Sequence, residues 1–251
     1  MIATTPVQDV DMDYDYGRFD SAAFTARVLA KWQALASVID HTLLKPEATR
    51  AQVEALCEEA ARYRFACVML NPVWVSTAVA ALSGTGIPVG AVLGFPFGAS
   101  LVSTLRSEAA ALIRLGAREL DMVMPIGLLK SGNHQAVHNA IQSVAADSHY
   151  DGAQVKVILE TSLLTMEEKL RGSELAIQGG ADFIKTSTGF SSGGATVADV
   201  ALMRGVAGNR CGVKAAGGIR TLADVKALLE AGANRIGASA SVAIVKELGA
   251  E

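Results

Sequence analysis

The sequence contains few cysteines, and none of them has the spacing of a structural site. Cys57, Cys67 and Cys211 are the only three in 251 residues, and no CxxC pair occurs. An odd number of distant thiols is not typical of a disulfide framework or a zinc site, so a reducing, cytoplasmic location is expected. Cys57 and Cys211 are interpreted as small buried apolar residues, whereas Cys67 lies in a predicted strand and is a candidate site residue.

The chain also lacks the features with which proteins bind nucleic acids and membranes. Its formal net charge of −3 provides no basic surface, and its aromatic residues, only 5% of the chain, form no stacking platform for bases. No apolar run is long enough to span a bilayer, and the N-terminus lacks the basic-then-apolar order of a secretory signal. Neither nucleic acid nor membrane is therefore expected as a partner.

Motifs of several common enzyme classes are missing as well. There is no GxGxxG or GxxxxGK for a nucleotide, no GxSxG elbow for a serine hydrolase and no HExxH for zinc. His134 and His138 are four residues apart on a predicted helix, but no third ligand accompanies them. The favoured interpretation is that both histidines are solvated residues of a helix. Neither a metal nor a cofactor is predicted.

The chain does contain a regular alternation of short apolar runs with helical patterns, which begins at residue 36. The runs span residues 36–44, 65–70, 88–96, 119–124, 155–160, 183–187, 212–216 and 235–239. Nearly continuous apolar strands are typical of parallel sheets covered on both faces. Eight such strand–helix units predict an α/β fold, a single-domain (β/α)8 TIM barrel. The alternative is an open doubly wound sheet, which usually has fewer strands and a glycine-rich first turn.

Local signals mark the ends of several predicted helices and the start of the domain. Thr165, Thr196 and Thr221 are each followed three residues later by an acid, as in a capping box. Glycines that suit C-terminal caps stand at positions 116, 179, 180 and 232. Residues 1–34 begin acidic, polar and without a period, so they are predicted to be an N-terminal extension, a flexible or helical arm. The barrel domain is predicted at 35–251.

Three lysines lie inside predicted strands, where apolar side chains are expected. Lys156, Lys185 and Lys214 belong to the runs VKVILE, FIKTS and GVKAA. One such lysine alone would be interpreted as half of an internal ion pair, with Asp121 or Glu160 as its partner. Several lysines in one barrel, with few acids to neutralise them, lower each other's pKa by repulsion and loss of hydration. A neutral amine suits a Schiff-base nucleophile, but the residues alone do not rank Lys185 above Lys214.

Glycine-rich loops follow the last strands of the predicted barrel. Gly217-Gly218 and Gly237-x-Ser239 come after the seventh and eighth runs, where many barrels hold a phosphate with backbone N–H groups. Ordinary turn glycines are the alternative, but two pairs at the same end of one barrel favour a phosphate site. Arg220 lies nearby, and it is equally consistent with a contact to the phosphate and with a surface or structural ion pair. The other candidates at strand ends and in loops are Asp40, His41, Cys67, Asn71, Asp121, Glu160 and the run Thr186, Ser187, Thr188 and Gly189.

Taken together, these motifs resemble those of the deoxyribose-phosphate aldolase family. DHTLLKPEAT, CVMLNP, VGAVLGFPFG, ELDMVMPIG, VKVILET, GADFIKTSTGF, VKAAGGIRT and RIGAS occur in the family's order from about residue 38 to residue 246. The resemblance implies a metal-independent class I lyase that reversibly cleaves 2-deoxy-D-ribose 5-phosphate into acetaldehyde and D-glyceraldehyde 3-phosphate. The alternatives are another Schiff-base sugar-phosphate aldolase or transaldolase, and a catalytically silent sugar-phosphate-binding barrel.

The resemblance also implies roles for individual residues. Lys185 matches the lysine that forms the Schiff base, and Lys214 and Asp121 match the proton-relay pair. The positions expected to bind substrate or its phosphate are Gly189, Gly217, Gly218, Gly237, Ser239, Thr186, Cys67 and Asp40. Barrels with apolar outer helices often pair, so a homodimer or homotetramer is expected.

Three positions depart from the pattern of the resemblance. Ala240 stands where some relatives carry a second serine, and Phe190 stands where some carry a lysine. The chain ends at Glu251 without the C-terminal tyrosine of some members. The first two changes remove phosphate contacts and the third affects one proton transfer, so phosphate affinity and the efficiency of that transfer are expected to differ.

Overall fold

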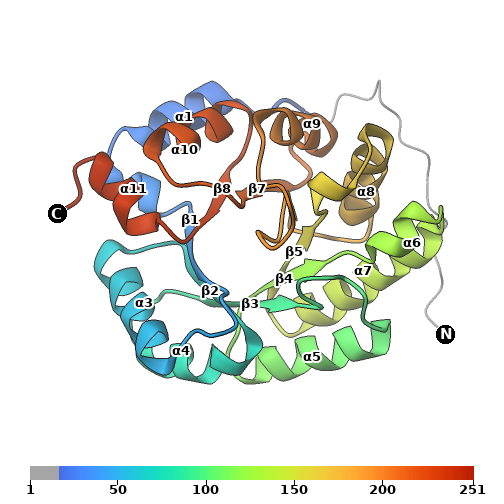
Figure 1. The fold of residues 1–251 in the computed structure, drawn as a ribbon, viewed down its shortest axis with the longest axis horizontal. Coiled ribbons are helices and arrows are strands. Elements are labelled where there is room, and N and C mark those ends of the chain that lie inside the picture. Colours follow the sequence, from blue (N-terminus) through green and yellow to red (C-terminus); the bar gives the residue numbers. More distant parts are fainter. Residues whose placement is uncertain (1–16) are drawn as a thin grey trace.

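The computed structural model describes residues 17–251, which form a closed barrel of eight parallel strands (Figure 1). The strands follow sequence order around the barrel, and β8 closes it by pairing with β1. Their bounds are β1 (Ile39–Leu43), β2 (Cys67–Leu70), β3 (Val89–Leu93), β4 (Glu119–Val123), β5 (Gln154–Ile158), β6 (Phe183–Lys185), β7 (Gly212–Ala216) and β8 (Arg235–Ala238). Seven of the eight apolar runs enclose their strand completely and β5 begins one residue earlier, so the predicted (β/α)8 barrel is confirmed.

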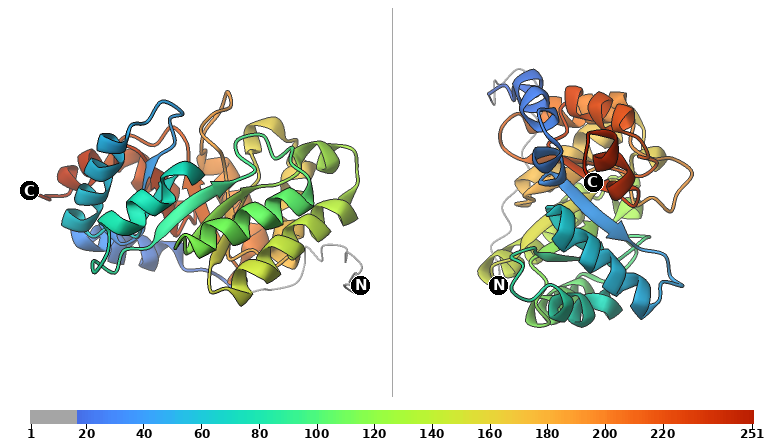
Figure 2. Two further views of the ribbon diagram at one scale, coloured as in Figure 1. Left: turned by 90° about the horizontal axis from the view of Figure 1, so that it is seen from below. Right: turned by 90° about the vertical axis from the view of Figure 1, so that its left-hand side faces the viewer.

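Helices surround the barrel on its outside, as the two side views show (Figure 2). They are α3 (Arg50–Tyr63), α4 (Val75–Ala81), α5 (Val102–Arg114), α6 (Ile126–Lys130), α7 (His134–Tyr150), α8 (Met166–Gln178), α9 (Val197–Ala207), α10 (Leu222–Glu230) and α11 (Ser241–Glu247). Short 3-10 turns, η1 (Pro72–Trp74) and η2 (Thr161–Leu163), follow β2 and β5. The apolar core lies between the strands and this outer layer. No helix within residues 17–251 combines the length and apolarity that crossing a bilayer requires.

The segment before the first strand is helical where the structure describes it. Helix α1 (Ser21–Leu29) packs against α10, and α2 (Trp32–Ala36) packs against α11. The side chain of Asp20 caps α1 by accepting a hydrogen bond from the Ala23 N–H at 2.8 Å. Residues 1–16 of the predicted arm lie outside the described residues. The division into an extension at 1–34 and a barrel at 35–251 remains a prediction.

The capping signals read from the sequence are largely present. Thr165 and Thr221 form complete capping boxes. At Thr196 one of the two hydrogen bonds of such a box is found, in which its side chain accepts from the Asp199 N–H at 3.0 Å. Gly116, Gly180 and Gly232 have positive φ after their helices, as expected of C-terminal caps. Gly179 was assigned to the same role, but its φ of −74° is right-handed, and Gly180 alone makes the turn.

Parallel register explains how charged side chains gather inside the barrel. Residues at paired positions of neighbouring parallel strands point to the same side of the sheet. The register pairs Asp121 with Lys156 and Lys185 with Lys214. All four side chains are buried, and they face the barrel interior rather than the helices.

A substitution at the start of α8 tests this account of the helix ends. Thr165→Ala removes the side chain that accepts from the Glu168 N–H, so the free energy of unfolding should fall by about 1 kcal/mol. Thr165→Ser keeps the acceptor and is the matched control. Urea unfolding followed by circular dichroism measures both variants. Wild-type stability in the alanine variant would contradict the assigned cap.

Candidate active site

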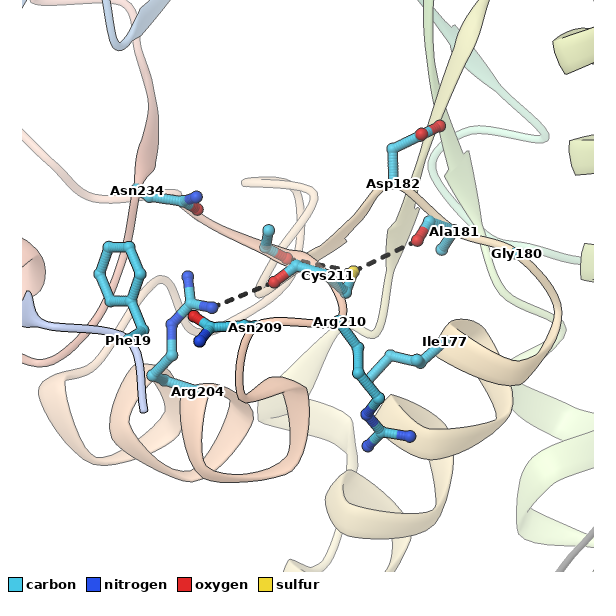
Figure 3. A pocket seen from close by; sticks show the side chains of 11 residues that line it. Phe19, Ile177, Gly180, Ala181, Asp182, Arg204, Asn209, Arg210, Cys211 and Asn234 are labelled. Atoms are coloured by element: carbon cyan, nitrogen blue, oxygen red, sulfur yellow. Dashed lines mark hydrogen bonds between the residues drawn. The ribbon is translucent and has the colours of Figure 1, made fainter. Parts of the chain in front are cut away.

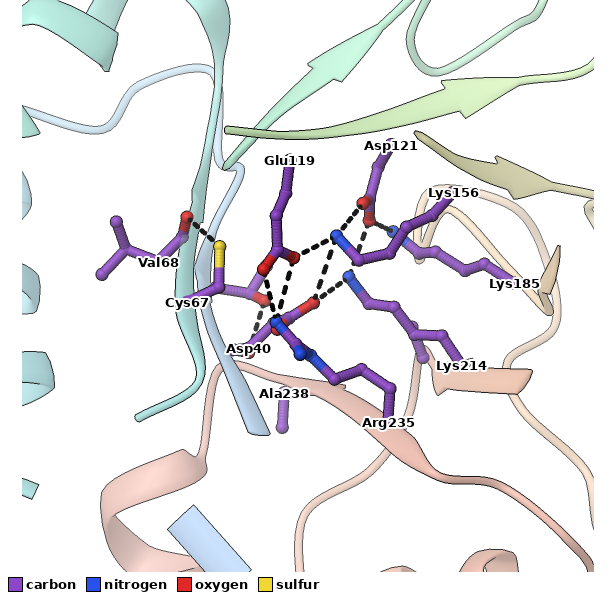
Figure 4. Close-up of polar contacts among 12 residues, drawn as sticks. Asp40, Cys67, Val68, Glu119, Asp121, Lys156, Lys185, Lys214, Arg235 and Ala238 are labelled. Carbon is purple, nitrogen blue, oxygen red and sulfur yellow. Dashed lines mark hydrogen bonds and ion pairs between the residues drawn. The ribbon is translucent and has the colours of Figure 1, made fainter. Parts of the chain in front are cut away.

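Two lysine amines share one carboxylate oxygen at the centre of the barrel (Figure 4). Asp121 Oδ2 accepts from Lys185 Nζ and from Lys214 Nζ, each at 2.7 Å, and its Oδ1 accepts from Lys156 Nζ at 3.0 Å. Lys185 and Lys214 are only 2% and 1% exposed. The structure therefore brings the three predicted catalytic side chains, Lys185, Lys214 and Asp121, within hydrogen-bond distance through one atom.

Further charges extend this cluster, and two of them were not singled out from the sequence. Glu119 pairs with Lys156 at 2.5 Å and with Arg235 at 2.8 Å. Asp40 pairs with Arg235 at 2.6 Å and with Lys214 at 2.5 Å. The expectation that few acids neutralise the lysines is therefore wrong. Glu119 lies two residues before Asp121 on the same strand, and alternate residues of a strand point to the same face of the sheet. The sequence therefore did indicate that Glu119 faces the barrel interior together with Asp121.

The acids do not act equally on the three lysines. Burial lowers the pKa of Lys185 to about 8, and the charge of Lys214 adds to this, although Asp121 opposes it. Burial also disfavours the charged form of Lys156, but Asp121 and Glu119 outweigh it and raise its pKa above the ordinary value. The amine of Lys185 is thus more readily neutral than that of Lys156. The sequence alone did not distinguish these two lysines by their pKa.

Two carboxylates of the cluster, Asp121 and Asp40, remain ionised. Burial alone would raise the pKa of Asp121, but Lys156 and Lys185 hold it well below its usual range. The pKa of Asp40 is lowered to about 2, because Lys214 and Arg235 outweigh the effect of burial. A charged Asp121 can therefore accept hydrogen bonds from groups beside it near neutral pH.

A cavity of about 410 Å³ opens over Lys185. It lies at the carboxyl ends of the strands, where loops of (β/α)8 barrels build active sites. The five predicted phosphate positions Gly189, Gly217, Gly218, Gly237 and Ser239 all line it. Gly217 has a φ of +91°, and a Cβ there would lie 3.1 Å from Gly194 Cα, so a side chain at this position would be strained and tightly packed.

Three of the predicted substrate-binding residues do not reach this cavity. Asp40, Cys67 and Thr186 are fully buried. Asp40 is enclosed by its ion pairs, Cys67 Sγ donates to the Val68 carbonyl at 3.1 Å, and Thr186 Oγ1 donates to the Ala216 carbonyl at 3.0 Å. The structure places these three residues outside the lining of the cavity, and their role as substrate- or phosphate-binding groups remains a prediction.

A second cavity, of about 450 Å³, lies at the opposite end of the barrel (Figure 3). Gly212 and Asn234, which line it, stand at the amino-terminal ends of β7 and β8. Its buried cation, Arg204, donates to the carbonyls of Gly232, Gly208 and Cys211 at 2.8, 2.8 and 3.0 Å. These bonds tie α9 to the turns before the strands, so a structural role accounts for Arg204.

One group of potential metal ligands occurs among the described residues. Asp40, Cys67 and Glu119 each offer an atom within 4.8 Å of the others. Both acids already pair with Lys156 or Arg235, and burial raises the pKa of the Cys67 thiol well above its ordinary value. Amino and guanidinium cations thus hold the place that a metal ion would need. His138, predicted to be solvated, is buried on α7 instead, with its Nδ1 3.4 Å from Asn139 Oδ1.

The fold and the cluster define a class of protein, and similarity to known proteins specifies the family. A (β/α)8 barrel that holds an amine of lowered pKa beside a carboxylate is suited to amine-based lyase chemistry. Residues 34–247 match the model of the DeoC/LacD family aldolases, and the chain belongs to this family.

Individual relatives agree with this assignment. A deoxyribose-phosphate aldolase of Thermoanaerobacter sp. is 52% identical over 85% of this chain and 96% of its own. The enzyme of that name from Caldanaerobacter subterraneus is 53% identical over 85% of this chain and 93% of its own. The solved tetrameric deoxyribose phosphate aldolase from Aeropyrum pernix superposes with a TM-score of 0.84 at 33% identity, covering 91% of this chain and 96% of that one.

The lowered pKa of Lys185 predicts a pH-dependent reactivity. Below about 8 the amine is increasingly protonated, so its acylation by a small reagent should slow about tenfold per pH unit. Lys156→Met removes a charge that lowers this pKa and should shift the profile to higher pH. Asp121→Asn removes a charge that raises the pKa and should shift it to lower pH.

Competitive labelling with peptide mass mapping measures these profiles, with the exposed Lys246 as the internal reference. Circular dichroism verifies that each variant is folded. Identical profiles in the wild type and both variants would contradict the electrostatic account of Lys185.

Proposed function

We propose that this chain catalyses the reversible cleavage of 2-deoxy-D-ribose 5-phosphate to acetaldehyde and D-glyceraldehyde 3-phosphate through a lysine Schiff base. The observation that carries the proposal is the position of Lys185, which lines the cavity and donates to the carboxylate that also binds Lys214. Relatives named deoxyribose-phosphate aldolase, about half identical over most of the chain, support the same reaction. The chain is accordingly a carbon–carbon lyase.

In the proposed mechanism, Lys185 is the nucleophile. Its neutral amine attacks the C1 aldehyde carbon of the open-chain sugar phosphate, and loss of water gives a protonated imine. Asp121 Oδ2 then no longer accepts a hydrogen bond from the free amine and can accept one from another donor. Lys214 stays beside it, and its charge adds to the effect of burial in lowering the pKa of unreacted Lys185, so a larger fraction of this amine is neutral.

Carbon–carbon cleavage follows from the charge on the imine. The C3 hydroxyl gives up its proton through a water held by Asp121 and Lys214, and the C2–C3 bond breaks as its electrons move toward the imine nitrogen. D-glyceraldehyde 3-phosphate leaves with C3 to C5, and an enamine of acetaldehyde remains on Lys185. Protonation of the enamine at C2 and hydrolysis release acetaldehyde and the free amine.

The glycine-rich end of the cavity is the proposed phosphate site. Gly189, Gly217, Gly218, Gly237 and Ser239 line the same cavity as Lys185, which suits a ligand that spans from the aldehyde to the phosphate. Glycine permits close approach of backbone N–H groups to phosphate oxygens. The side chains of Lys45 and Arg220 also line this cavity and add positive charge to it.

We further propose that the chain acts as a homodimer or homotetramer in the cytoplasm. The solved relative from Aeropyrum pernix is tetrameric. Val73 in η1, and Phe97 and Leu101 in the loop after β3, are highly exposed, and an interface would cover such apolar groups. The three cysteines are free and buried, which suits a reducing compartment.

Trapping of the intermediate tests the nucleophile. Borohydride reduction in the presence of acetaldehyde should leave an ethyl adduct on Lys185, because the reduced imine is a stable secondary amine. Peptide mass mapping locates the adduct, and Lys185→Leu should abolish it. An adduct only on Lys214 or Lys156 would contradict the assignment. Cleavage of 2-deoxy-D-ribose 5-phosphate should also persist in excess chelator, since no step requires a metal.

Phe190 offers a test of the phosphate end. It lines the cavity beside Gly189, and its ring packs edge-on against Phe95 with centroids 5.2 Å apart. Phe190→Lys brings an ammonium group to this rim, so KM for the phosphorylated sugar should fall by up to about fivefold, less at high salt. KM for unphosphorylated deoxyribose should not change, and Phe190→Leu is the control. Equal effects on both sugars would contradict a phosphate at this end.

A further inference from the structure

Glu160 has an unusual backbone conformation at the edge of the proposed active site. It follows β5 and has φ +57° and ψ +62°, the left-handed region that favours glycine. Within residues 17–251, Arg64 is the other non-glycine residue with positive φ, and it ends α3 as an ordinary C-terminal cap. Hydrogen bonds to the β6 side hold both neighbours of Glu160, from Leu159 N–H to the Lys185 carbonyl and from Thr161 N–H to the Thr186 carbonyl. The strained conformation is therefore imposed by its surroundings.

The side chain of Glu160 is equally unusual. It is only 2% exposed, yet no lysine, arginine or histidine among the described residues forms an ion pair with it. Its Oε1 has no hydrogen-bond partner within that part of the chain. Buried carboxylates are normally paired with cations or fully hydrogen-bonded, so packing alone does not explain this residue.

The other oxygen of Glu160 binds one residue of the cavity wall. Thr188 donates to Oε2 twice, from its backbone N–H at 3.3 Å and from its hydroxyl in a very short contact. Thr188 lines the cavity three residues after Lys185, next to Gly189. Glu160 itself does not line the cavity, so any effect on a ligand passes through Thr188.

These contacts determine what the Thr188 hydroxyl can offer to a ligand. A hydroxyl has one proton to donate and two lone pairs that accept. The proton is committed to Glu160, and one lone pair accepts from the Phe190 N–H at 3.0 Å. One accepting site remains, so Thr188 can receive a proton donor from the cavity but cannot donate to a phosphate oxygen.

We propose that Glu160 is a positioning residue that fixes the Thr188 hydroxyl as an acceptor for a hydroxyl group of the sugar phosphate. The inference rests on the proposed function, because it needs a substrate that carries a hydroxyl between the aldehyde and the phosphate. Thr188 lies between Lys185 and Gly189 in the sequence, and all three line the cavity. The C4 hydroxyl of the proposed substrate likewise lies between the reacting carbons and the phosphate. The left-handed turn at Glu160 brings its carboxylate to Thr188.

The test compares two acceptors in the synthetic direction, with acetaldehyde as the donor. One is D-glyceraldehyde 3-phosphate, and the other is 3-phosphooxypropanal, which lacks the hydroxyl. Glu160→Leu should lower kcat/KM for the first about tenfold to a hundredfold and change the second little, because only the first uses the Thr188 acceptor. A Glu160 that merely orders the loop would instead lower both values by the same factor.

Two further substitutions separate the carboxylate from the backbone turn. Glu160→Gln keeps an oxygen that accepts from Thr188 and should retain most of the wild-type preference. Glu160→Gly keeps the left-handed conformation without strain but removes the acceptor, so it should behave like Glu160→Leu. Wild-type selectivity in the glycine variant would overturn the proposal. Arg64→Gly, at the other left-handed position, is the matched control and should leave the preference unchanged.

A double-mutant cycle tests whether Glu160 acts through Thr188. Thr188→Val removes the hydroxyl, and adding Glu160→Leu to it should cause little further loss of selectivity, because the two changes remove the same interaction. Additive losses would overturn the proposal. Wild-type protein that neither cleaves 2-deoxy-D-ribose 5-phosphate nor forms a trapped imine would instead refute the proposed function, so the two failures are distinguishable.

Discussion

The hydrogen bonds that Lys185 and Lys214 share on one oxygen of Asp121 are the interaction on which the rest of the site depends. Two ammonium groups on one atom repel each other, and burial removes the water that would screen them. Deprotonating one amine relieves both penalties, and Lys185 is the lysine whose pKa falls to about 8. The barrel thus stabilises a neutral amine by making its protonated form costly.

This arrangement requires support from a second set of charges. Lys156 and Arg235 pair with Glu119, and both also contact acids of the central group, Asp121 and Asp40. Replacing either cation would remove one of the partners of two buried carboxylates and leave their charge less well compensated, which is destabilising. The charges next to the proposed nucleophile are consequently held in place by charges that never face the cavity.

The sequence predicted the fold more completely than the site. Continuous apolar runs identify strands buried on both faces, and that pattern is local, so the eight strands could be located from it. Lys185, Lys214 and Asp121 could be found because charges in such runs are conspicuous. The depth of a residue is not local information, so the sequence did not show that Asp40, Cys67 and Thr186 are buried outside the lining of the cavity. The left-handed turn at Glu160 had no sequence signal, because Gly or Asn is the usual residue in that conformation.

Closure of the sheet has a consequence for how the active site comes into being. The ionic cluster draws on β1, β4, β5, β6, β7 and β8, and Arg235 arrives on the last strand of the chain. Until β8 docks between β7 and β1, Asp40 and Glu119 lack their guanidinium partner. A chain that has been synthesised only as far as β7 therefore already contains the proposed nucleophile, Lys185, but not all of the charges that surround it. The complete set of charges around the proposed active site is therefore present only in the closed barrel.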